Sequence, residues 1–458
     1  MVKRKEKIED PLKLLLPGVI YDYFELVHAE KSYLCNNLNS PCMKRLFSLF
    51  ILLLCVIIAL NAQSLSSYRL LFDKRDMGSG ALKVQCAFTI DFAGEDSLVL
   101  DFGGNFEELA VEELMITPAD VRFTFDPITK HIIFYRAQTD TLRVEMEYIF
   151  LNLTSVFMYN NKGAEVWECI CTDSGEYYYP MRRGMSYRGE VQFLVPDVLC
   201  VVSQGSLDVS EGLKIDQCVP LNFVFLDRSQ YEKRTMQGDY KCDVYQLKGQ
   251  QAGADRYAEL CRFTALAIQW FEAKYGDAYI NSAYGTHDYP AFVFHNGNAS
   301  FNRYNMGFIS ASQEKFATAP DIYPLLHEIG HRWMGEYTMF IESGSRGYAF
   351  IVETLNEFMT LQCIREIVGI EAYEDLIADY RMRWNKIRGT EQDVHPIEVT
   401  ENNNIPVTYR KGVVMLDGIA REVGYDEVIA TIVESYQACK GKPDLRYEDF
   451  GQLCKFAL

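Results

Sequence analysis

The sequence is short of the residues on which several protein classes depend. Its 45 Lys and Arg residues are outnumbered by 63 Asp and Glu residues, which gives a formal net charge of −18. Binding to a phosphate backbone needs clustered Lys and Arg, so we expect no nucleic-acid partner. Thirteen Cys in 458 residues are too few for a small disulfide scaffold. The composition, 48% hydrophobic and 24% charged, excludes wholesale disorder, collagen and a simple coiled coil.

Long apolar runs are also scarce, and the longest one lies near the N-terminus. Residues 46–60 are apolar apart from Ser48, follow two basic residues and end before Ala62. This order of charge, apolar core and small residue is typical of a secretory signal peptide. The run is short for a membrane span, which needs ~20 apolar residues. We therefore expect residues 43–62 to be a signal peptide, with an uncleaved membrane anchor as the alternative.

A signal peptide stands at the true N-terminus of a protein, yet 42 residues precede this one. Residues 1–42 are expected to be an upstream extension that the mature protein lacks, or else a cytoplasmic tail before an anchor. A cleaved signal predicts export to the periplasm or the extracellular space. Contact with a membrane is then expected only if the segment 46–60 stays uncleaved.

The first part of the remaining chain has a hydrophobic period of two. Apolar and polar residues alternate in the runs 84–92, 142–150, 191–195 and 221–225. Alternation sends one set of side chains to a core and the other to water, as in a half-buried strand. Residues 67–248 are therefore predicted to form an N-terminal antiparallel β domain.

The pattern changes to helical spacing beyond the Gly- and Gln-rich residues 249–253. Apolar residues between 260 and 271 recur at helical intervals, a strand-like run follows at 291–294, and further helical segments fill residues 321–458. We predict a second, mainly helical domain over residues 252–458 with a small β component. The fold class is therefore expected to be α+β.

The segment His327-Glu328-Ile329-Gly330-His331 carries the strongest chemical signal. Residues i and i+4 lie one turn apart on the same face of a helix, so the two imidazoles can share one Zn²⁺. The adjacent Glu328 can then act as the general base on a water molecule. A proline three residues upstream of the first His suits a helix start.

A catalytic zinc has three protein ligands, so a third is expected on a neighbouring helix. Glu336 stands too close on the same segment, and Glu342 borders a Gly-rich stretch that we expect to be a loop. The next helical run contains Glu353 and Glu357, one turn apart. Glu353 is the predicted ligand. Glu357 is predicted to accept a hydrogen bond from a ligand His, with a solvated helix face as its alternative.

Three motifs in this order resemble the membrane-alanyl-aminopeptidase family of zinc peptidases in the gluzincin clan. Residues 327–335 are similar to the family's HExxHxWxG helix, residues 353–358 to its third-ligand helix, and residues 409–412 to its Tyr-x-Lys-Gly segment. The similarity spans roughly residues 67–458. The spacing between the second His and the ligand Glu is a few residues longer here than is usual in the family.

This resemblance implies a thermolysin-like catalytic domain that binds one Zn²⁺, in which the Tyr409 hydroxyl helps to stabilise an oxyanion. The chain ends soon after Tyr409, so the C-terminal helical domain of larger members is expected to be missing. The family also carries a Gly-x-Met-Glu-Asn strand that binds the substrate, whose Glu holds the substrate's α-ammonium. The matching segment, Tyr304-Asn305-Met306-Gly307, has Tyr304 in place of that Glu. A phenol is neutral near pH 7 and cannot pair with an ammonium as a carboxylate does.

We therefore predict an exported zinc metallopeptidase that acts on peptides or proteins. Whether it works as an aminopeptidase or as an endopeptidase stays open, because of Tyr304. Two alternatives are a non-catalytic peptide-binding protein on a peptidase scaffold and a zinc hydrolase of a non-peptide substrate.

Overall fold

The computed structural model describes the chain from Gln63 onward, with gaps. The described residues are 63–75, 81–102, 114–150, 166–169, 179–182, 189–203, 213–215, 222–237, 241–249, 252–278, 291–295, 303–305, 308–335, 338–339, 341, 344–400, 404–442 and 445–451. The predicted extension over residues 1–42 and the predicted signal peptide over 43–62 lie outside this set. None of the helices in the described part is long and apolar enough to span a bilayer.

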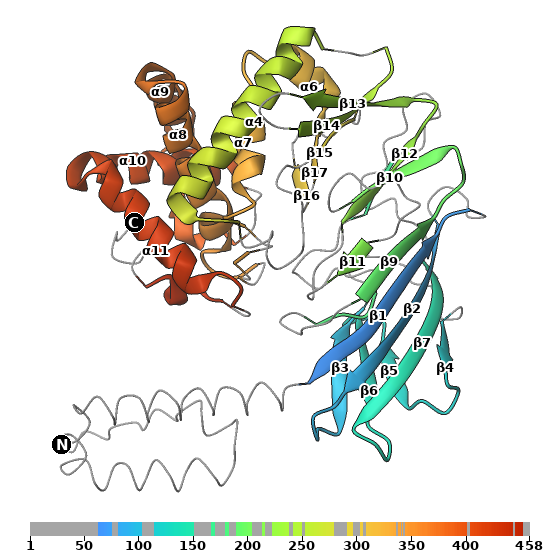
Figure 1. Cartoon of the computed structure of the whole chain (residues 1–458). Coiled ribbons are helices and arrows are strands. Elements are labelled where there is room, and N and C mark those ends of the chain that lie inside the picture. The colour runs from blue at the N-terminus through green and yellow to red at the C-terminus, as the bar shows by residue number, and fades with distance from the viewer. Residues whose placement is uncertain are drawn as a thin grey trace, which may run out of the picture. The chain divides into compact units, whose positions relative to one another are not determined.

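Three of the four runs with a period of two, residues 84–92, 142–150 and 191–195, lie in a six-stranded sheet in the order β11-β9-β1-β2-β7-β4 (Figure 1). Its strands are β1 (Ser64–Asp73), β2 (Leu82–Asp91), β4 (Met115–Thr117), β7 (Thr141–Phe150), β9 (Gly189–Leu194) and β11 (Leu213–Ile215). The fourth run, 221–225, leads into β12 (Phe223–Asp227) of another sheet. On β2, alternate residues from Leu82 to Ile90 are buried and their neighbours are more exposed. This alternation is the reason why the sequence pattern was readable here.

The prediction of a wholly antiparallel domain is wrong at one pair of strands. β1 runs parallel to β9, in a register that begins at Tyr68 and Gly189. The two strands are far apart in the sequence, so the chain has room to return in the same direction, which a hairpin cannot do. A Cβ at Gly189 would lie 2.2 Å from the carbonyl oxygen of Tyr68, so this close approach requires glycine.

Two three-stranded sheets complete this part of the chain. Their orders are β3-β6-β5 and β10-β12-β8. The strands are β3 (Ser97–Asp101), β5 (Phe123–Asp126), β6 (His131–Tyr135), β8 (Val166–Cys169), β10 (Leu199–Val202) and β12 (Phe223–Asp227). Aromatic rings join the six-stranded sheet to the sheet β3-β6-β5, since the ring centroid of Phe88 on β2 lies 5.8 Å from that of Phe134 on β6.

A five-stranded sheet borders the helices. Its order is β13-β14-β15-β17-β16, from β13 (Tyr231–Gln237), β14 (Lys241–Leu247), β15 (Ala291–His295), β16 (Arg303–Asn305) and β17 (Phe308–Ser312). β14, β15 and β17 are parallel to one another, and β16 is antiparallel to β17 at the end of the sheet. The sheet draws strands from both sides of the predicted domain boundary at residues 248–252, and the division of the chain into domains stays a prediction.

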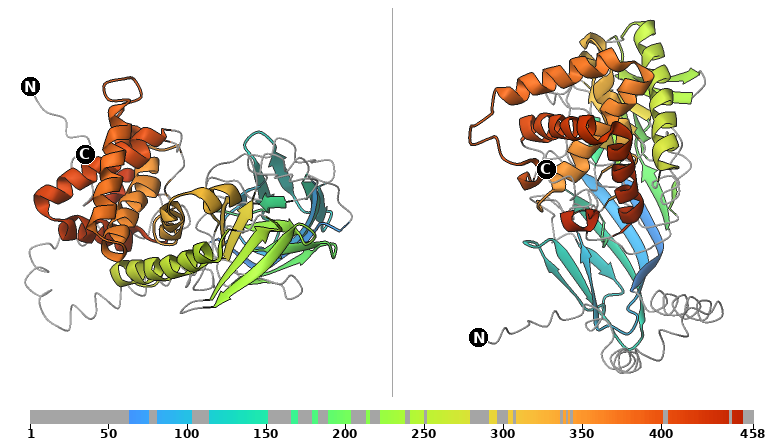
Figure 2. Two further views of the ribbon diagram at one scale, coloured as in Figure 1. Left: turned by 90° about the horizontal axis from the view of Figure 1, so that it is seen from above. Right: turned by 90° about the vertical axis from the view of Figure 1, so that its left-hand side faces the viewer.

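The rest of the described chain is mainly helical. Its helices are α4 (Ala254–Tyr275), α6 (Gln313–Thr318), α7 (Tyr323–Gly330), η5 (Phe350–Thr354), α8 (Leu355–Ile367), α9 (Ile370–Asn385), η6 (Pro396–Glu398), η7 (Val407–Lys411), α10 (Gly412–Val423), α11 (Tyr425–Cys439) and η8 (Tyr447–Phe450). Figure 2 shows α8 to α11 gathered in one cluster, with α4 running from this cluster towards the five-stranded sheet. α4 contacts β13 at one end and α7, α8 and α11 along its length.

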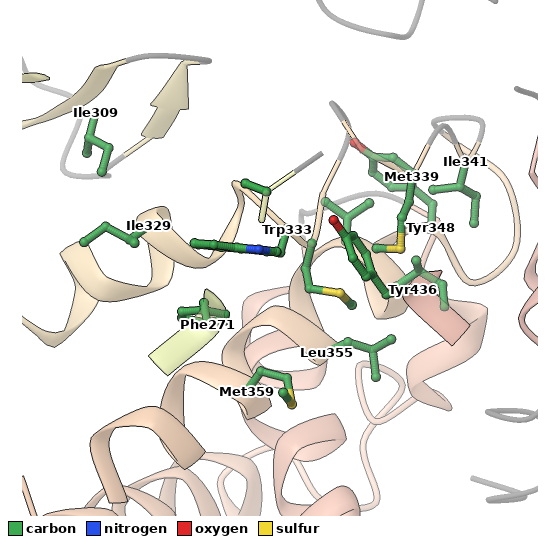
Figure 3. Close-up of a cluster of buried hydrophobic side chains, with 14 of the residues drawn as sticks. Phe271, Ile309, Ile329, Trp333, Met339, Ile341, Tyr348, Leu355, Met359 and Tyr436 are labelled. Carbon is green, nitrogen blue, oxygen red and sulfur yellow. The ribbon is translucent and has the colours of Figure 1, made fainter. Parts of the chain in front are cut away.

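An apolar core holds α7 against α4 and α8 (Figure 3). The rings of Phe271 on α4 and Trp333 just after α7 are stacked, with centroids 5.1 Å apart. The Trp333 indole also donates a hydrogen bond to the Gly276 carbonyl at 2.9 Å. Truncating a buried aromatic side chain of this kind typically costs about 3–5 kcal/mol, so this core restrains the helix that carries the two His residues.

Candidate metal centre

Short helix α7 presents the paired His residues at the base of a cavity. The helix begins with Pro324 in its first turn, where a proline loses no hydrogen bond. The Asp321 carboxylate accepts a hydrogen bond from the Tyr323 backbone N–H at 3.0 Å and so satisfies one of the N–H groups that the first turn leaves free. His331 directly follows the helix and keeps helical backbone angles, so both imidazoles stay on one face.

The structure brings His327, His331 and Glu353 together. Oε2 of Glu353 lies 3.1 Å from Nε2 of His327 and 3.4 Å from Nε2 of His331. One candidate ligand atom from each of the three residues lies within 4.8 Å of the others. The two imidazole planes are nearly perpendicular, at 89°, with centroids 4.7 Å apart. Two imidazoles and a carboxylate are a donor set that suits Zn²⁺.

The charge balance of the site also fits a divalent cation. Three carboxylates, those of Glu328, Glu353 and Glu357, are each buried to 8% exposure or less. Burial of a carboxylate is costly unless a positive charge or hydrogen bonds compensate it. Burial works against ionisation of Glu353, but the two imidazoles outweigh it and hold the pKa of this carboxyl far below its usual range. The residues present therefore fit a zinc ion.

The Glu353 carboxylate acts on the pKa of both imidazoles. Burial disfavours the protonated form of His327, yet its close contacts with the carboxylates of Glu353 and Glu357 raise its pKa well above the usual value. The negative charge of Glu353 likewise outweighs burial and raises the pKa of His331. This attraction for a proton is the attraction that a cation at the same place would experience.

Glu353 and Tyr409 both stand on π-helical turns. Glu353 lies in η5, whose wide turn is closed by a hydrogen bond from the Leu355 N–H to the Phe350 carbonyl. Tyr409 lies in η7, closed in the same way from Gly412 to Val407. Each turn leads directly into a helix, α8 or α10. Single π turns recur at functional sites because the extra residue redirects the side chains that precede the helix.

Small residues let these elements approach closely. A Cβ at Gly330 of α7 would lie 2.1 Å from Oδ1 of Asn356, and the Asn356 amide donates to the His327 carbonyl at 2.8 Å. A Cβ at Gly412 would lie 2.5 Å from Cγ2 of Thr354. Each glycine thus leaves room for a side chain of the neighbouring element, so that α7 packs closely on α8 and α10 packs closely on η5. This packing places Glu353 opposite the His pair.

Glu357 lies one turn beyond Glu353 and contacts His327 from the other side. Its Oε2 is 2.6 Å from Nδ1 of His327. Burial opposes its ionisation, but the contact with His327 and the charge of Arg410 lower its pKa overall. The alternative of a solvated helix face does not apply to this position, since Glu357 is 8% exposed.

Tyr409 lines the cavity beside the candidate metal ligands, with its ring centroid 5.6 Å from that of His327. Burial and the negative charges of Glu353 and Glu328 raise the pKa of this phenol well above its usual value. Tyr409 therefore stays protonated and can donate a hydrogen bond over the whole physiological pH range.

The predicted substrate strand is described only in part. Tyr304 and Asn305 belong to β16, where they pair with Ile309 and Phe308 of β17. Both strands contact α7. Met306 and Gly307 lie outside the described residues, and so do the side chains of β16.

A cavity of about 950 Å³ joins these residues. Its lining includes His327, Glu328, Glu353 and Tyr409, and it extends to Phe316 on α6 and to Tyr380 on α9. The volume is large enough for a short peptide, since ligand pockets usually measure about 300–1,000 Å³. Two further residues of its wall, Tyr380 and Arg410, contact Glu357. Arg410 lies within the Tyr-x-Lys-Gly segment at residues 409–412, whereas nothing in the sequence pointed to Tyr380.

Comparison with solved structures identifies the fold. A mutant of the M1 zinc metallopeptidase from Deinococcus radiodurans, bound to a Tyr-Ser-Ala substrate, matches with a TM-score of 0.60 and 15% identity over 86% of this chain and 94% of that one. Leukotriene A4 hydrolase from Saccharomyces cerevisiae matches with a TM-score of 0.62 and 13% identity. The match covers 86% of this chain and 65% of the yeast enzyme, just under two thirds.

Sequence comparison adds nothing to this likeness. No protein-family model matches the chain, and no curated protein matches it either. At this level of identity, the structural likeness speaks for the fold and leaves the activity to the geometry of the site. The chain has the fold of the M1 zinc metallopeptidases, with an N-terminal β part and a helical part that carries a candidate zinc centre.

Proposed function

We propose that the mature chain is an exported zinc-dependent metallopeptidase that hydrolyses peptide bonds. The observation that carries this proposal is the meeting of His327, His331 and Glu353 in a cavity that also exposes Glu328 and Tyr409. Every role needed for metal-assisted hydrolysis has a candidate there. The thermolysin-like character of the helical domain and the single Zn²⁺ are parts of the same proposal.

His327, His331 and Glu353 would hold the ion. Zinc supplies Lewis acidity, which polarises a carbonyl and lowers the pKa of a water molecule. Glu328 is buried beside both imidazoles and lines the cavity. Its carboxylate takes the proton of the attacking water and passes it to the leaving amine.

Tyr409 stabilises the charge that develops on the carbonyl oxygen. Its raised pKa keeps the hydroxyl protonated, so it can donate a hydrogen bond to an oxyanion in the cavity. Donors placed in advance in a dry site are worth more than in water, because they need no reorganisation during the reaction.

The strand β16 is proposed to pair with the substrate backbone as an added strand. It stands at the end of the five-stranded sheet and contacts α7. Tyr304, Asn305, Met306 and Gly307 would form this substrate-binding segment. With Tyr304 in place of a carboxylate, we expect the enzyme to be less dependent on a free α-ammonium than an aminopeptidase is.

A digest of a peptide library, with and without a chelator, tests the proposal. We expect bound zinc by metal analysis and cleavage that stops when the metal is removed. Trimming from the N-terminus would indicate aminopeptidase action, and internal cuts would indicate endopeptidase action. A zinc-loaded chain that cuts no peptide would refute the proposal.

A second candidate is a zinc hydrolase of a non-peptide substrate. Two observations favour it, namely Tyr304 and the similarity in fold to a leukotriene A4 hydrolase. Zinc-dependent turnover of a small ester or epoxide by a chain that leaves peptides intact would support this candidate.

Export is tested separately from catalysis. A secreted or periplasmic product whose N-terminus lies after residue 60 is expected if the segment 43–62 is a cleaved signal. An intact segment in the membrane fraction would support the anchor.

A further inference from the structure

The Glu357 carboxylate sits at the centre of a second layer of side chains. Its Oε2 faces Nδ1 of His327 at 2.6 Å. Its Oε1 accepts a hydrogen bond from the Tyr380 hydroxyl and lies 3.6 Å from Nη1 of Arg410. One oxygen therefore faces the candidate ligand and the other is held by groups from η7 and α9.

Arg410 ties these elements together. Its guanidinium lies over the ring of Tyr380, with Cζ 4.0 Å from the ring centroid, in a cation–π contact. Its Nη1 also donates to the backbone carbonyl of Tyr409 at 3.0 Å. Arg410 thus connects α9 with the π turn that carries Tyr409.

The network is shielded from water. Glu357 and Tyr380 are 8% and 7% exposed, and the Arg410 side chain is 20% exposed. In such surroundings a hydrogen bond is stronger than in water, and a carboxylate that lost its donors could not replace them with solvent. Tyr380 and Arg410 therefore restrict the orientation of the Glu357 carboxylate.

We infer that Tyr380 and Arg410 are positioning residues, which hold Glu357 so that it orients the His327 imidazole towards the metal. The inference rests on the proposed zinc site. A carboxylate that pairs with Nδ1 leaves Nε2, the nitrogen that faces Glu353, free to bind a metal. Without its outer partners Glu357 can rotate, and His327 loses the restraint on its ring.

The test replaces Tyr380 by Phe, which removes only the hydroxyl. The chain offers a matched control on the same helix, since Tyr373 of α9 donates its hydroxyl to another buried carboxylate, that of Asp417, at 2.7 Å. We expect Tyr380→Phe to weaken zinc binding about tenfold, at the lower end of the range for outer partners of a metal ligand. Tyr373→Phe should change it less than twofold. The dissociation constants come from competition with a chromophoric chelator at pH 7.

A third variant, Arg410→Gln, removes the stacking cation and should also weaken zinc binding. Thermal unfolding of the metal-free proteins shows whether the two Tyr variants lose similar stability. If Tyr380→Phe and Tyr373→Phe bind zinc alike, the positioning role is wrong. If the zinc dissociation constants of the variants and the unmodified chain differ as predicted while the unmodified chain cuts no peptide, only the proposed peptidase function fails. Absence of zinc binding by the unmodified chain would overturn both.

Discussion

Helix α7 and the two π turns η5 and η7 supply the same site by different means. α7 places His327 and His331 on one face through the ordinary helical repeat, so their relation is local. Glu353 and Tyr409 come from turns that break this repeat. They face the His pair only because α8 packs against α7 and α10 packs against α8 and η5. Half of the site is therefore a property of one segment, and half is a property of the packing.

The largest expected effect comes from substitutions that distinguish the residues of α7 from those of the π turns. Glu328→Gln in α7 should bind zinc and lose about 10²–10⁴-fold in turnover, because it removes the general base. Glu353→Gln in η5 should lose both zinc and turnover, because it removes a ligand. Metal analysis of the two purified variants, beside a surface control such as Glu371→Gln, checks this. Equal zinc contents in the two variants would contradict the assignment of Glu353 as a ligand and Glu328 as the general base.

Tyr409→Phe tests the other π turn. Turnover should fall about 10²–10³-fold, as is typical when one oxyanion donor is lost. Zinc content should stay unchanged because the phenol is assigned no bond to the metal. A variant with full activity would show that the Tyr409 hydroxyl takes no part in the reaction.

Acid should destabilise the fold through a His residue outside the site. Burial lowers the pKa of His295 on β15 to about 4. The unfolded chain binds a proton below about pH 6.5, whereas the folded chain does so only below about pH 4. The contribution of His295 to the free energy of unfolding is therefore fully present above pH 6.5. It is lost as the pH drops towards 4, and the loss is on the order of 3 kcal/mol.

Urea unfolding of the metal-free chain at pH 7 and pH 4.5 measures this slope, and His295→Gln should flatten it. With the contribution of His295 known, the loss of zinc in acid can be distinguished from the unfolding of the chain in acid. An unchanged slope in the variant would place the acid sensitivity elsewhere.

The smallest effect concerns the packing that aligns η5 with η7. Gly412→Ala should destabilise the chain by about 1–3 kcal/mol, because its Cβ would meet Thr354 at 2.5 Å. Gly418 stands on the same helix with open space around it. Gly418→Ala should therefore stabilise by about 0.4–1 kcal/mol. Thermal unfolding checks both signs, and a neutral Gly412→Ala would mean that η5 and α10 can move apart freely.

The fold could be anticipated where the pattern was local. Alternation along β2 and helical spacing along α4 were readable, because one face of each element is buried. The parallel pairing of β1 with β9 was not readable, since it joins segments far apart in the sequence. The extension of the five-stranded sheet through β13 and β14 was missed for the same reason.

By itself, the sequence determined the HExxH helix, the placement of two imidazoles on one face of it, and the two glutamates, Glu353 and Glu357, that offer a third ligand. Only the tertiary structure decided that Glu353 faces the His pair, that Glu357 turns inward, and that Tyr380 and Arg410 surround it. The physical reason is that a helical repeat acts over four residues, whereas contacts between α7, α8, α9 and η7 depend on side chains that meet across the core.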